Sequence, residues 1–312
     1  MLPHGFLLID KPVGITSHDV VARLRKILQT KAIGHSGTLD PLASGLMVCL
    51  LNEATKVSSY ILEGDKAYTV GVRFGVETDT LDITGEVTAQ HAVPAFDDHF
   101  VEKVKQAALT LSGDFEWNVP LFSAKKINGK KLYDYARAGE DLPVVERPKK
   151  QMRFWDIQVD EITAEGAVFS LQCSKGSYVR QWVSELGSLL GYGACLQSLR
   201  RTWSKPYFVS QAITLDQLQK EVDSGGFFRQ TRSFVNLADS LPHYKRIVVK
   251  GLDATLVSNG QIGHGLRNLL IAVFDPHQDE MVQIVEQRSG ELKALIGLEP
   301  QKGFVIRRVF RY

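Results

Sequence analysis

The sequence has few cysteines, no excess of charge of one sign and no long apolar run among its 312 residues. The three cysteines, Cys49, Cys173 and Cys195, are far apart and odd in number, which argues against a disulfide framework and a thiolate zinc site. No apolar run approaches the roughly 20 residues of a membrane-spanning helix. The first apolar stretch, residues 6–9, lacks a basic segment before it and is shorter than the roughly 7 to 15 residues of a signal peptide. We therefore expect a cytoplasmic protein without a membrane partner.

Two patterns typical of catalytic sites are also missing. None of the eight histidines stands at the H-x-x-x-H spacing of helical metal ligands, so we expect no bound metal. The stretch Gly34-His35-Ser36 begins like the G-x-S-x-G turn of serine hydrolases, but Thr38 stands at the position of the second glycine. The sequence therefore argues against both a metalloenzyme and a serine hydrolase.

The composition is that of a folded protein, with 44% hydrophobic and 23% charged residues. The chain length is typical of about two domains. Apolar periodicity predicts strands near 6–9, 46–50, 66–76 and 152–173, and helices near 17–28, 53–62, 98–111 and 178–190. Beyond Pro242, short apolar runs at 268–274, 281–286, 292–296 and 304–310 predict a small β domain. The whole pattern indicates a mixed α+β fold with a large antiparallel component.

Positive charge is concentrated between Lys125 and Arg153, where nine basic residues accompany four acidic ones. Within this stretch, Asn128-Gly129 is typical of a tight hairpin turn, so we expect it to project from the body of the protein. Such a patch suits binding to a polyanion, although a solvated surface is an equally good interpretation on charge alone.

A single carboxylate, Asp40, stands in the glycine-rich stretch AIGHSGTLDPLASGLMVCL at residues 32–50. The glycines and Pro41 permit a tight loop with well-defined side-chain directions. Such a loop suits a catalytic site, but it equally suits an ordinary turn that leads into a buried strand.

Two reaction classes are compatible with Asp40. A glycosidase needs a second carboxylate across the bond, and only the fold could bring Glu53, Asp79 or Asp82 there. A lone carboxylate can instead act as a covalent nucleophile in an isomerisation, provided that a cation beside it keeps it ionised. Arg180, at the start of a predicted helix, is a candidate for that cation.

Five blocks of the sequence, taken in order, resemble the TruB family of bacterial tRNA pseudouridine synthases. The blocks are DKPVGITSHDV (10–20), GHSGTLDPLASGLMVCL (34–50), KAYTV (66–70), VPLFSAKKINGKKLYDYARAG (119–139), and CSKGSYVRQW with GACLQSLRRT (173–182 and 193–202). The resemblance implies that uridine 55 in the T-arm loop of tRNA is isomerised to pseudouridine without a cofactor. The expected partner is therefore tRNA.

The resemblance also implies a pseudouridine-synthase-type fold, with a mixed and largely antiparallel sheet, flanking helices and an RNA-gripping insertion. The catalytic domain is expected at residues 1–242, with the insertion at about 119–153. Residues 243–312 stand in the place of the family's PUA-like β domain, which contacts the acceptor end of tRNA. We expect a monomer.

The resemblance assigns roles to individual residues. Asp40 falls on the catalytic nucleophile, Arg180 on its ion-pair partner, and Tyr68 on the tyrosine that packs against the flipped uracil. Whether Asp40 attacks C6 of the base or C1′ of the sugar stays open, as does removal of the C5 proton by Tyr68. Tyr178 and Leu199 fall on residues that line the uracil pocket.

Further residues are expected to contact the RNA outside the uracil pocket. His35 falls on the histidine that enters the RNA loop and occupies the space of the extruded base, which offsets part of the lost stacking. Candidates for contacts with the RNA backbone are Lys125, Lys126, Lys130, Lys131, Arg137 and Arg153. Three positions depart from the family pattern, since Phe122, Lys131 and Ser204 replace the usual tyrosine, arginine and glycine. An alternative from another class is a tRNA-binding protein or folding chaperone whose chemistry is incidental.

The missing metal-ligand spacing predicts that a chelator leaves the rate of pseudouridine formation unchanged. The measurement is conversion of uridine in a tRNA transcript by protein that was treated with chelator and then dialysed into assay buffer. A loss of rate that an added transition metal restores would contradict this prediction.

Overall fold

The computed structural model describes residues 3–61, 64–123, 125–127, 130–132, 135, 148–226 and 230–312. Its largest element is a ten-stranded sheet with the main order β14-β1-β3-β12-β4-β11-β10-β7. The strands are β1 (Gly5–Lys11), β3 (Ala43–Leu51), β4 (Lys66–Phe74), β7 (Gly113–Asn118), β10 (Lys149–Ile162), β11 (Gly166–Cys173), β12 (Ala194–Ser204) and β14 (Phe234–Asn236), with β2 (Ile33–His35) beside β3 and β13 (Tyr207–Phe208) beside β12. Among its described strand pairs, only β3 and β12 run parallel. The predicted α+β fold with a large, mostly antiparallel sheet is confirmed.

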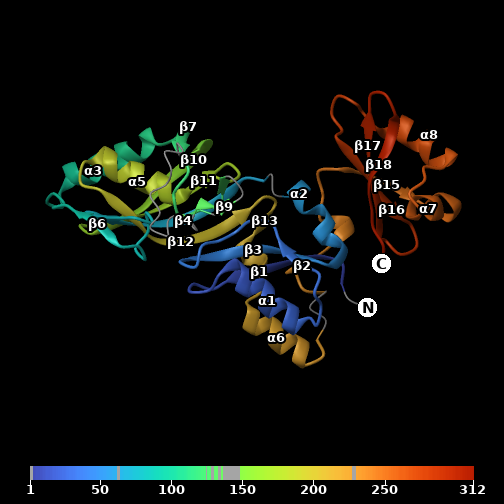
Figure 1. The fold of residues 1–312 in the computed structure, drawn as a ribbon, viewed down its shortest axis with the longest axis horizontal. Coiled ribbons are helices and arrows are strands. Elements are labelled where there is room, and N and C mark those ends of the chain that lie inside the picture. Colours follow the sequence, from blue (N-terminus) through green and yellow to red (C-terminus); the bar gives the residue numbers. More distant parts are fainter. Residues whose placement is uncertain are drawn as a thin grey trace.

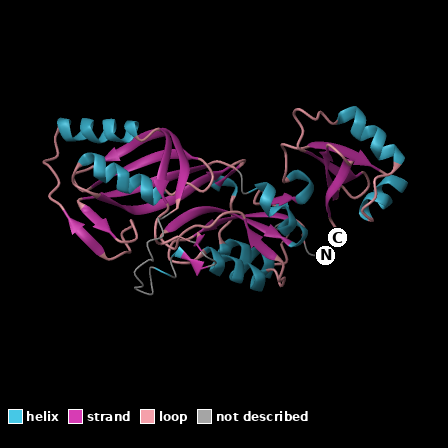
Figure 2. Ribbon diagram, turned by 45° about the horizontal axis from the view of Figure 1, so that its top comes forward, coloured by secondary structure: helices cyan, strands magenta, loops and turns pink. Residues whose placement is uncertain are grey.

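Two pairs of helices cover parts of this sheet (Figures 1 and 2). Helices α1 (Ser17–Ile27) and α6 (Leu215–Asp223) pack together beside β1, while α3 (Asp98–Thr110) and α5 (Val179–Leu190) pack together beside β10 and β12. Helix α1 begins with a capping box, in which the Thr16 side chain accepts from the Asp19 N–H and the Asp19 carboxylate accepts from the Thr16 N–H. Helix α5 ends at Gly191, which adopts the left-handed conformation. Local sequence signals thus set these helix boundaries.

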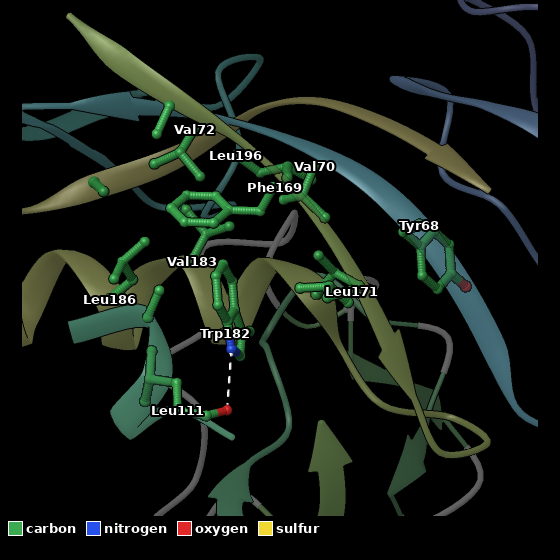
Figure 3. Close-up of a cluster of buried hydrophobic side chains, with 14 of the residues drawn as sticks. Tyr68, Val70, Val72, Leu111, Phe169, Leu171, Trp182, Val183, Leu186 and Leu196 are labelled. Carbon is green, nitrogen blue, oxygen red and sulfur yellow. Dashed lines mark hydrogen bonds between the residues drawn. The ribbon is translucent and has the colours of Figure 1, made fainter. Parts of the chain in front are cut away.

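The core between α5 and the sheet is centred on Trp182 (Figure 3). Its side chain is fully buried, and its Nε1 donates to the carbonyl of Leu111 at 3.3 Å. Full burial of a large apolar side chain contributes roughly 1.5–3 kcal/mol to stability. Figure 3 shows Tyr68 at the edge of this cluster, with its hydroxyl directed away from the cluster. The packing therefore holds α5 and the Tyr68 strand at a fixed separation.

Two sequence predictions need correction. The helix expected at 53–62 is a 3₁₀ helix, Asn52–Val57, followed by the single turn α2 (Ser58–Ile61). The run 268–274, expected as a strand, falls on helix α8 (His264–Val273) and its C-cap residue. Leu266 and Leu270 are buried at helical spacing there, whereas Ile271 is exposed. A short, continuous apolar run does not distinguish a strand from a helix, and here tertiary packing selected the helix.

Two short hairpins occur in the structure, and the second of them was predicted from the sequence. Strands β5 (Val76–Thr78) and β6 (Val87–Gln90) pair on either side of the 79–86 turn. Strands β8 (Lys126–Ile127) and β9 (Lys130–Lys131) pair within the basic stretch. The Asn128-Gly129 turn itself lies outside the described residues.

A second, four-stranded sheet follows near the C-terminus, in the order β15 (Lys245–Val249), β16 (Met281–Glu286), β17 (Leu292–Glu299) and β18 (Gly303–Val309). Helices α7 (Gly251–Ser258) and α8 lie beside this sheet, and both contribute to its core (Figure 1). Its other side shares one hydrophobic cluster with the large sheet, which includes Phe6, Leu295 and Phe310. No helix in the described part of the chain is long and apolar enough to span a membrane.

The close approach of β3 and β12 depends on Gly45. This residue pairs with Arg201, has φ +100°, and a β-carbon on it would overlap the carbonyl oxygen of Arg201 and lie 2.8 Å from its nitrogen. Only glycine accepts both the dihedral angle and the close approach.

We expect Gly45→Ala to lower the free energy of unfolding by more than about 3 kcal/mol, because backbone strain adds to a clash with rigid backbone. The control is Gly191→Ala, where φ is +84° but no atom lies within 4 Å of the added β-carbon. Strain alone predicts a loss of about 1 kcal/mol there. Urea denaturation measures both values, and equal losses would show that the approach of β12 imposes no constraint at Gly45.

Candidate active site

A cavity of about 860 Å³ opens where the Asp40 loop, β4, β12 and the start of α5 meet. Six residues singled out in the sequence line it together, namely His35, Asp40, Tyr68, Tyr178, Arg180 and Leu199. They come from segments up to 164 residues apart in the chain, so only the fold brings them to one place. This cavity is the candidate active site.

The Asp40 loop is tied to the start of α1. The Ser17 hydroxyl donates to the carbonyl of Leu39 at 3.0 Å and accepts from the Leu39 N–H at 2.8 Å. The Gly14 N–H donates to the carbonyl of Pro41 at 2.8 Å. The carboxylate itself is 43% exposed, so it is open to a substrate rather than buried. A fixed backbone thus presents an accessible carboxylate.

Arg180 is the cation that the sequence suggested for Asp40. Its Nε lies 3.1 Å from Asp40 Oδ2, and its side chain is only 7% exposed. Its two terminal nitrogens donate to the carbonyls of Thr80 and Phe122, each at 2.8 Å. With carbonyl and carboxylate oxygens on three sides, the guanidinium is held in a single orientation.

Asp82 is a second carboxylate beside Arg180, with Oδ2 at 3.8 Å from Nη1. It is buried, and its Oδ1 accepts from the N–H of Thr84 at 3.0 Å and from the Thr80 hydroxyl at 3.1 Å. Among the described residues that line the cavity, Asp40 is the sole carboxylate. Asp82 therefore pairs with Arg180 from outside the cavity. The described lining does not contain the flanking pair of acids that a glycosidase needs.

Arg201 is a site residue that the sequence interpretation missed. It is 1% exposed, lines the cavity and lies opposite Tyr68 in the sheet register. Its Nε donates to the carbonyl of Leu46 at 2.6 Å, and its terminal nitrogens donate to the carbonyls of Gly37 and Thr38 at 3.3 and 3.4 Å. The sequence did contain a clue to this residue, namely two adjacent arginines, Arg200 and Arg201, on one predicted stretch. Because side chains alternate along a strand, one of the two must face inward.

Tyr68 and His35 are both neutral near pH 7. Burial raises the pKa of Tyr68 to about 12, although the charge of Arg201 and a hydrogen bond with it act in the opposite direction. Burial also lowers the pKa of His35, and the positive charge of Arg201 adds to this effect. Neither side chain therefore adds charge to the cavity.

The remaining residues predicted to line the uracil pocket, Tyr178 and Leu199, also line the cavity. Tyr178 is the N-cap residue of α5, and burial raises the pKa of its hydroxyl. Leu199 is 8% exposed on β12, where it pairs with Ala43 at the start of β3. Both side chains line the same cavity as Asp40.

The candidate RNA-backbone residues are only partly described. Lys125 is exposed, and the guanidinium of Arg153 lies over the ring of Trp155 at 5.6 Å. Lys126, Lys130 and Lys131 are placed in the β8–β9 hairpin, but their side chains and the whole of Arg137 lie outside the described residues. The structure adds Lys66, Lys150 and Lys175 to the cavity wall, which sequence reasoning did not single out. No cluster of potential metal ligands occurs in the described ranges.

Comparison with known proteins gives a consistent family. Residues 25–179 match the family model for the TruB family pseudouridylate synthase N-terminal domain, and residues 180–237 match that for the tRNA pseudouridylate synthase B C-terminal domain. The chain is 53% identical over 310 residues to the tRNA pseudouridine synthase B of Bdellovibrio bacteriovorus, covering 99% of this chain and 97% of that protein. It is 38% identical over 266 residues to the tRNA pseudouridine synthase B of Bacillus subtilis, covering 83% of each.

Solved structures support the same fold. An H/ACA RNP bound to a substrate RNA containing 2′-deoxyuridine contains a chain that matches with a TM-score of 0.68 and 22% identity, covering 100% of this chain and 86% of that one. A Cbf5-Nop10-Gar1 complex matches with a TM-score of 0.66 and 23% identity, covering 99% and 85%. At these identities the likeness concerns the fold alone.

The pKa of Tyr68 gives a test of the site's electrostatics. The difference in ultraviolet absorbance between the protein and its Tyr68→Phe variant should show phenolate formation centred near pH 12 rather than near pH 10. Because burial disfavours the phenolate, the neutral Tyr68 should contribute fully to the stability of the fold below pH 10. This contribution should be lost as the pH rises towards 12. The same difference measured in urea should return to about 10. A folded-state midpoint near 10, with far-ultraviolet circular dichroism unchanged, would show that the hydroxyl is solvated.

Proposed function

Because the chain belongs to the TruB family of pseudouridylate synthases, we propose that it converts uridine 55 in the T-arm loop of tRNA to pseudouridine. Identity of 53% over nearly the whole length to a tRNA pseudouridine synthase B supports the substrate class. The observation that carries the chemistry is the 3.1 Å pair of Asp40 and Arg180 at an open cavity with no second carboxylate among its described lining residues. An isomerisation needs one nucleophile and no hydrolytic acid–base pair.

In the proposed reaction, the Asp40 carboxylate attacks the flipped nucleotide at C6 of the base or C1′ of the sugar. The N1–C1′ bond breaks, the uracil turns within the cavity and a C5–C1′ bond forms. The bond to Asp40 breaks and restores its carboxylate, and the C5 proton leaves while N1 gains a proton. Atoms and charge balance without a co-reactant. Arg180 orients the Asp40 carboxylate, because its own guanidinium is fixed by the carbonyls of Thr80 and Phe122.

The uracil is proposed to lie between Tyr68, Tyr178 and Leu199, which line the cavity with Asp40. Extrusion of a base costs a few kcal/mol of stacking, and aromatic and apolar side chains offset part of that cost. A tyrosine whose pKa is about 12 keeps its own proton at pH 7, which favours packing over proton removal as the role of Tyr68. A neutral His35 suits insertion between RNA bases, since a stacked imidazole needs no charge.

We further propose a catalytic domain at residues 1–242, with an RNA-gripping insertion at about 119–153, and an RNA-binding domain at 243–312 that contacts the acceptor end. A cavity of about 640 Å³ beside α7, lined by Lys250, Arg288 and Lys293 among others, supports RNA binding by the second unit. The protein is proposed to act in the cytoplasm as a monomer, without metal or cofactor.

The decisive variant is Asp40→Asn. We expect it to lower pseudouridine formation by at least about 10³-fold, because the amide is a poor nucleophile, while the dissociation constant for tRNA stays within about threefold. The control is Asp79→Asn, since this side chain is outside the cavity and accepts from the Glu86 N–H. Conversion is measured by mapping pseudouridine in the tRNA, together with a check that the mass of the RNA is unchanged. Affinity is measured by filter binding.

Each competing hypothesis has a different outcome. Retained turnover in Asp40→Asn would exclude the nucleophile role, and a tRNA-binding protein or chaperone would leave the wild-type protein without pseudouridine formation. Release of free uracil would indicate a glycosidase.

A further inference from the structure

Lys149 and Lys150 are adjacent on β10 and point to opposite faces of the sheet. Lys149 is 63% exposed at the side chain and lies 4.0 Å from a carboxylate oxygen of Glu116 on β7. Lys150 instead lines the Asp40 cavity. Because strand side chains alternate, this orientation follows from the pairing of Lys150 with Trp117 in the sheet register.

The ammonium of Lys150 lies over the turn that precedes α5. The turn is closed by the Ser177 N–H, which donates to the carbonyl of Ser174, and Gly176 within it has φ +68°. A β-carbon on Gly176 would overlap Lys150 Nζ and lie 3.3 Å from its Cε. The missing side chain at Gly176 therefore leaves the space that the ammonium occupies.

The described residues around this ammonium are unfavourable to its charge. Burial lowers the pKa of Lys150, and the positive charges of Lys125 and Lys175 lower it further. Within the described ranges, no carboxylate lies within 4.0 Å of Lys150 Nζ and no acceptor takes a hydrogen bond from it. Lys150 thus has two further cations near it and no described anion, and such surroundings favour an anionic ligand.

We propose that Lys150, together with Lys175, binds a phosphodiester group of the substrate RNA next to the nucleotide that enters the Asp40 cavity. The inference rests on the proposed function and adds an anchor at the mouth of the cavity. A phosphate held there fixes the RNA backbone beside the extruded base, so that contact energy offsets part of the unstacking.

The first experiment compares Lys150→Gln with Lys149→Gln in the full chain. The dissociation constant of a T-arm stem-loop RNA is measured from 50 to 200 mM KCl. Loss of one phosphate contact reduces the magnitude of the slope of log association constant against log[salt] by about 0.7–0.9. This change corresponds to about tenfold weaker binding at 50 mM and about fourfold weaker binding at 200 mM. Lys149→Gln should leave the slope unchanged, because its ammonium faces Glu116.

The second experiment moves the ammonium without removing its charge. Gly176→Ala should displace the flexible end of Lys150 and weaken binding as Lys150→Gln does, while Gly191→Ala controls for strain at positive φ. Phosphates of the stem-loop are then replaced one at a time by uncharged methylphosphonates. The wild-type protein should lose affinity at a phosphate adjacent to the target uridine, and Lys150→Gln should be insensitive to that same replacement.

The outcomes separate this site from the proposed function. If wild-type protein forms pseudouridine but Lys150→Gln keeps the wild-type slope, or Lys149→Gln loses as much, the phosphate site is wrong and the function stands. If sensitivity to methylphosphonate survives in Lys150→Gln, the phosphate lies elsewhere and the site is again wrong. If wild-type protein neither binds the RNA nor converts uridine, both inferences fail.

Discussion

The buried guanidinium of Arg180 links the segments that form the cavity. A charged group removed from water costs several kcal/mol unless its hydrogen-bonding capacity is satisfied. Here the Asp40 carboxylate, the carbonyl of Thr80 and the carbonyl of Phe122 satisfy it from three separate loops, while Asp82 lies behind it. Each loop is thereby fixed relative to α5, which Trp182 anchors to the sheet. The orientation of the proposed nucleophile is therefore a consequence of how the fold accommodates one arginine.

The wider charge balance of the cavity is positive. Lys11, Lys66, Arg180 and Arg201 are buried around it, against the carboxylates of Asp40 and Asp82. Burial lowers the pKa of Lys11 to about 8 and also lowers that of Lys66. Lys11 donates to the carbonyl of Ile15 at 2.6 Å, and Lys66 to that of Gly64 at 2.7 Å, so backbone oxygens accept hydrogen bonds from both cations. The negative charge of Asp40 also stabilises the charged form of Lys11. A surplus of positive charge suits a polyanionic substrate, and Lys150 extends it to the cavity mouth.

The second sheet is joined to the first by shared core packing rather than by a flexible connection alone. Phe310 and Leu295 lie in the same cluster as Phe6, and the Arg311 N–H donates to the Glu53 carboxylate at 2.7 Å. The two cavities consequently have a defined spacing. An RNA that reaches both would be recognised by its shape as well as by its charge.

Local patterns in the sequence determined the elements with clear periodicity, the hairpin in the basic stretch, and the tight loop that carries Asp40. Motif resemblance indicated which side chains matter, and the structure places His35, Tyr68, Tyr178, Arg180 and Leu199 with Asp40 around one cavity. These signals were sufficient because each lies within a few neighbouring residues or a short motif.

Only the tertiary structure decided which members of adjacent pairs face the cavity. Arg200 points outward to Asp10 while Arg201 is buried beneath the Asp40 loop, and Lys149 and Lys150 diverge in the same way. The partnership of Asp82 with Arg180 and the helical state of α8 were likewise hidden. In a strand, a shift of one residue exchanges the two faces, so orientation depends on register with strands far away in the sequence. No local pattern contains that information.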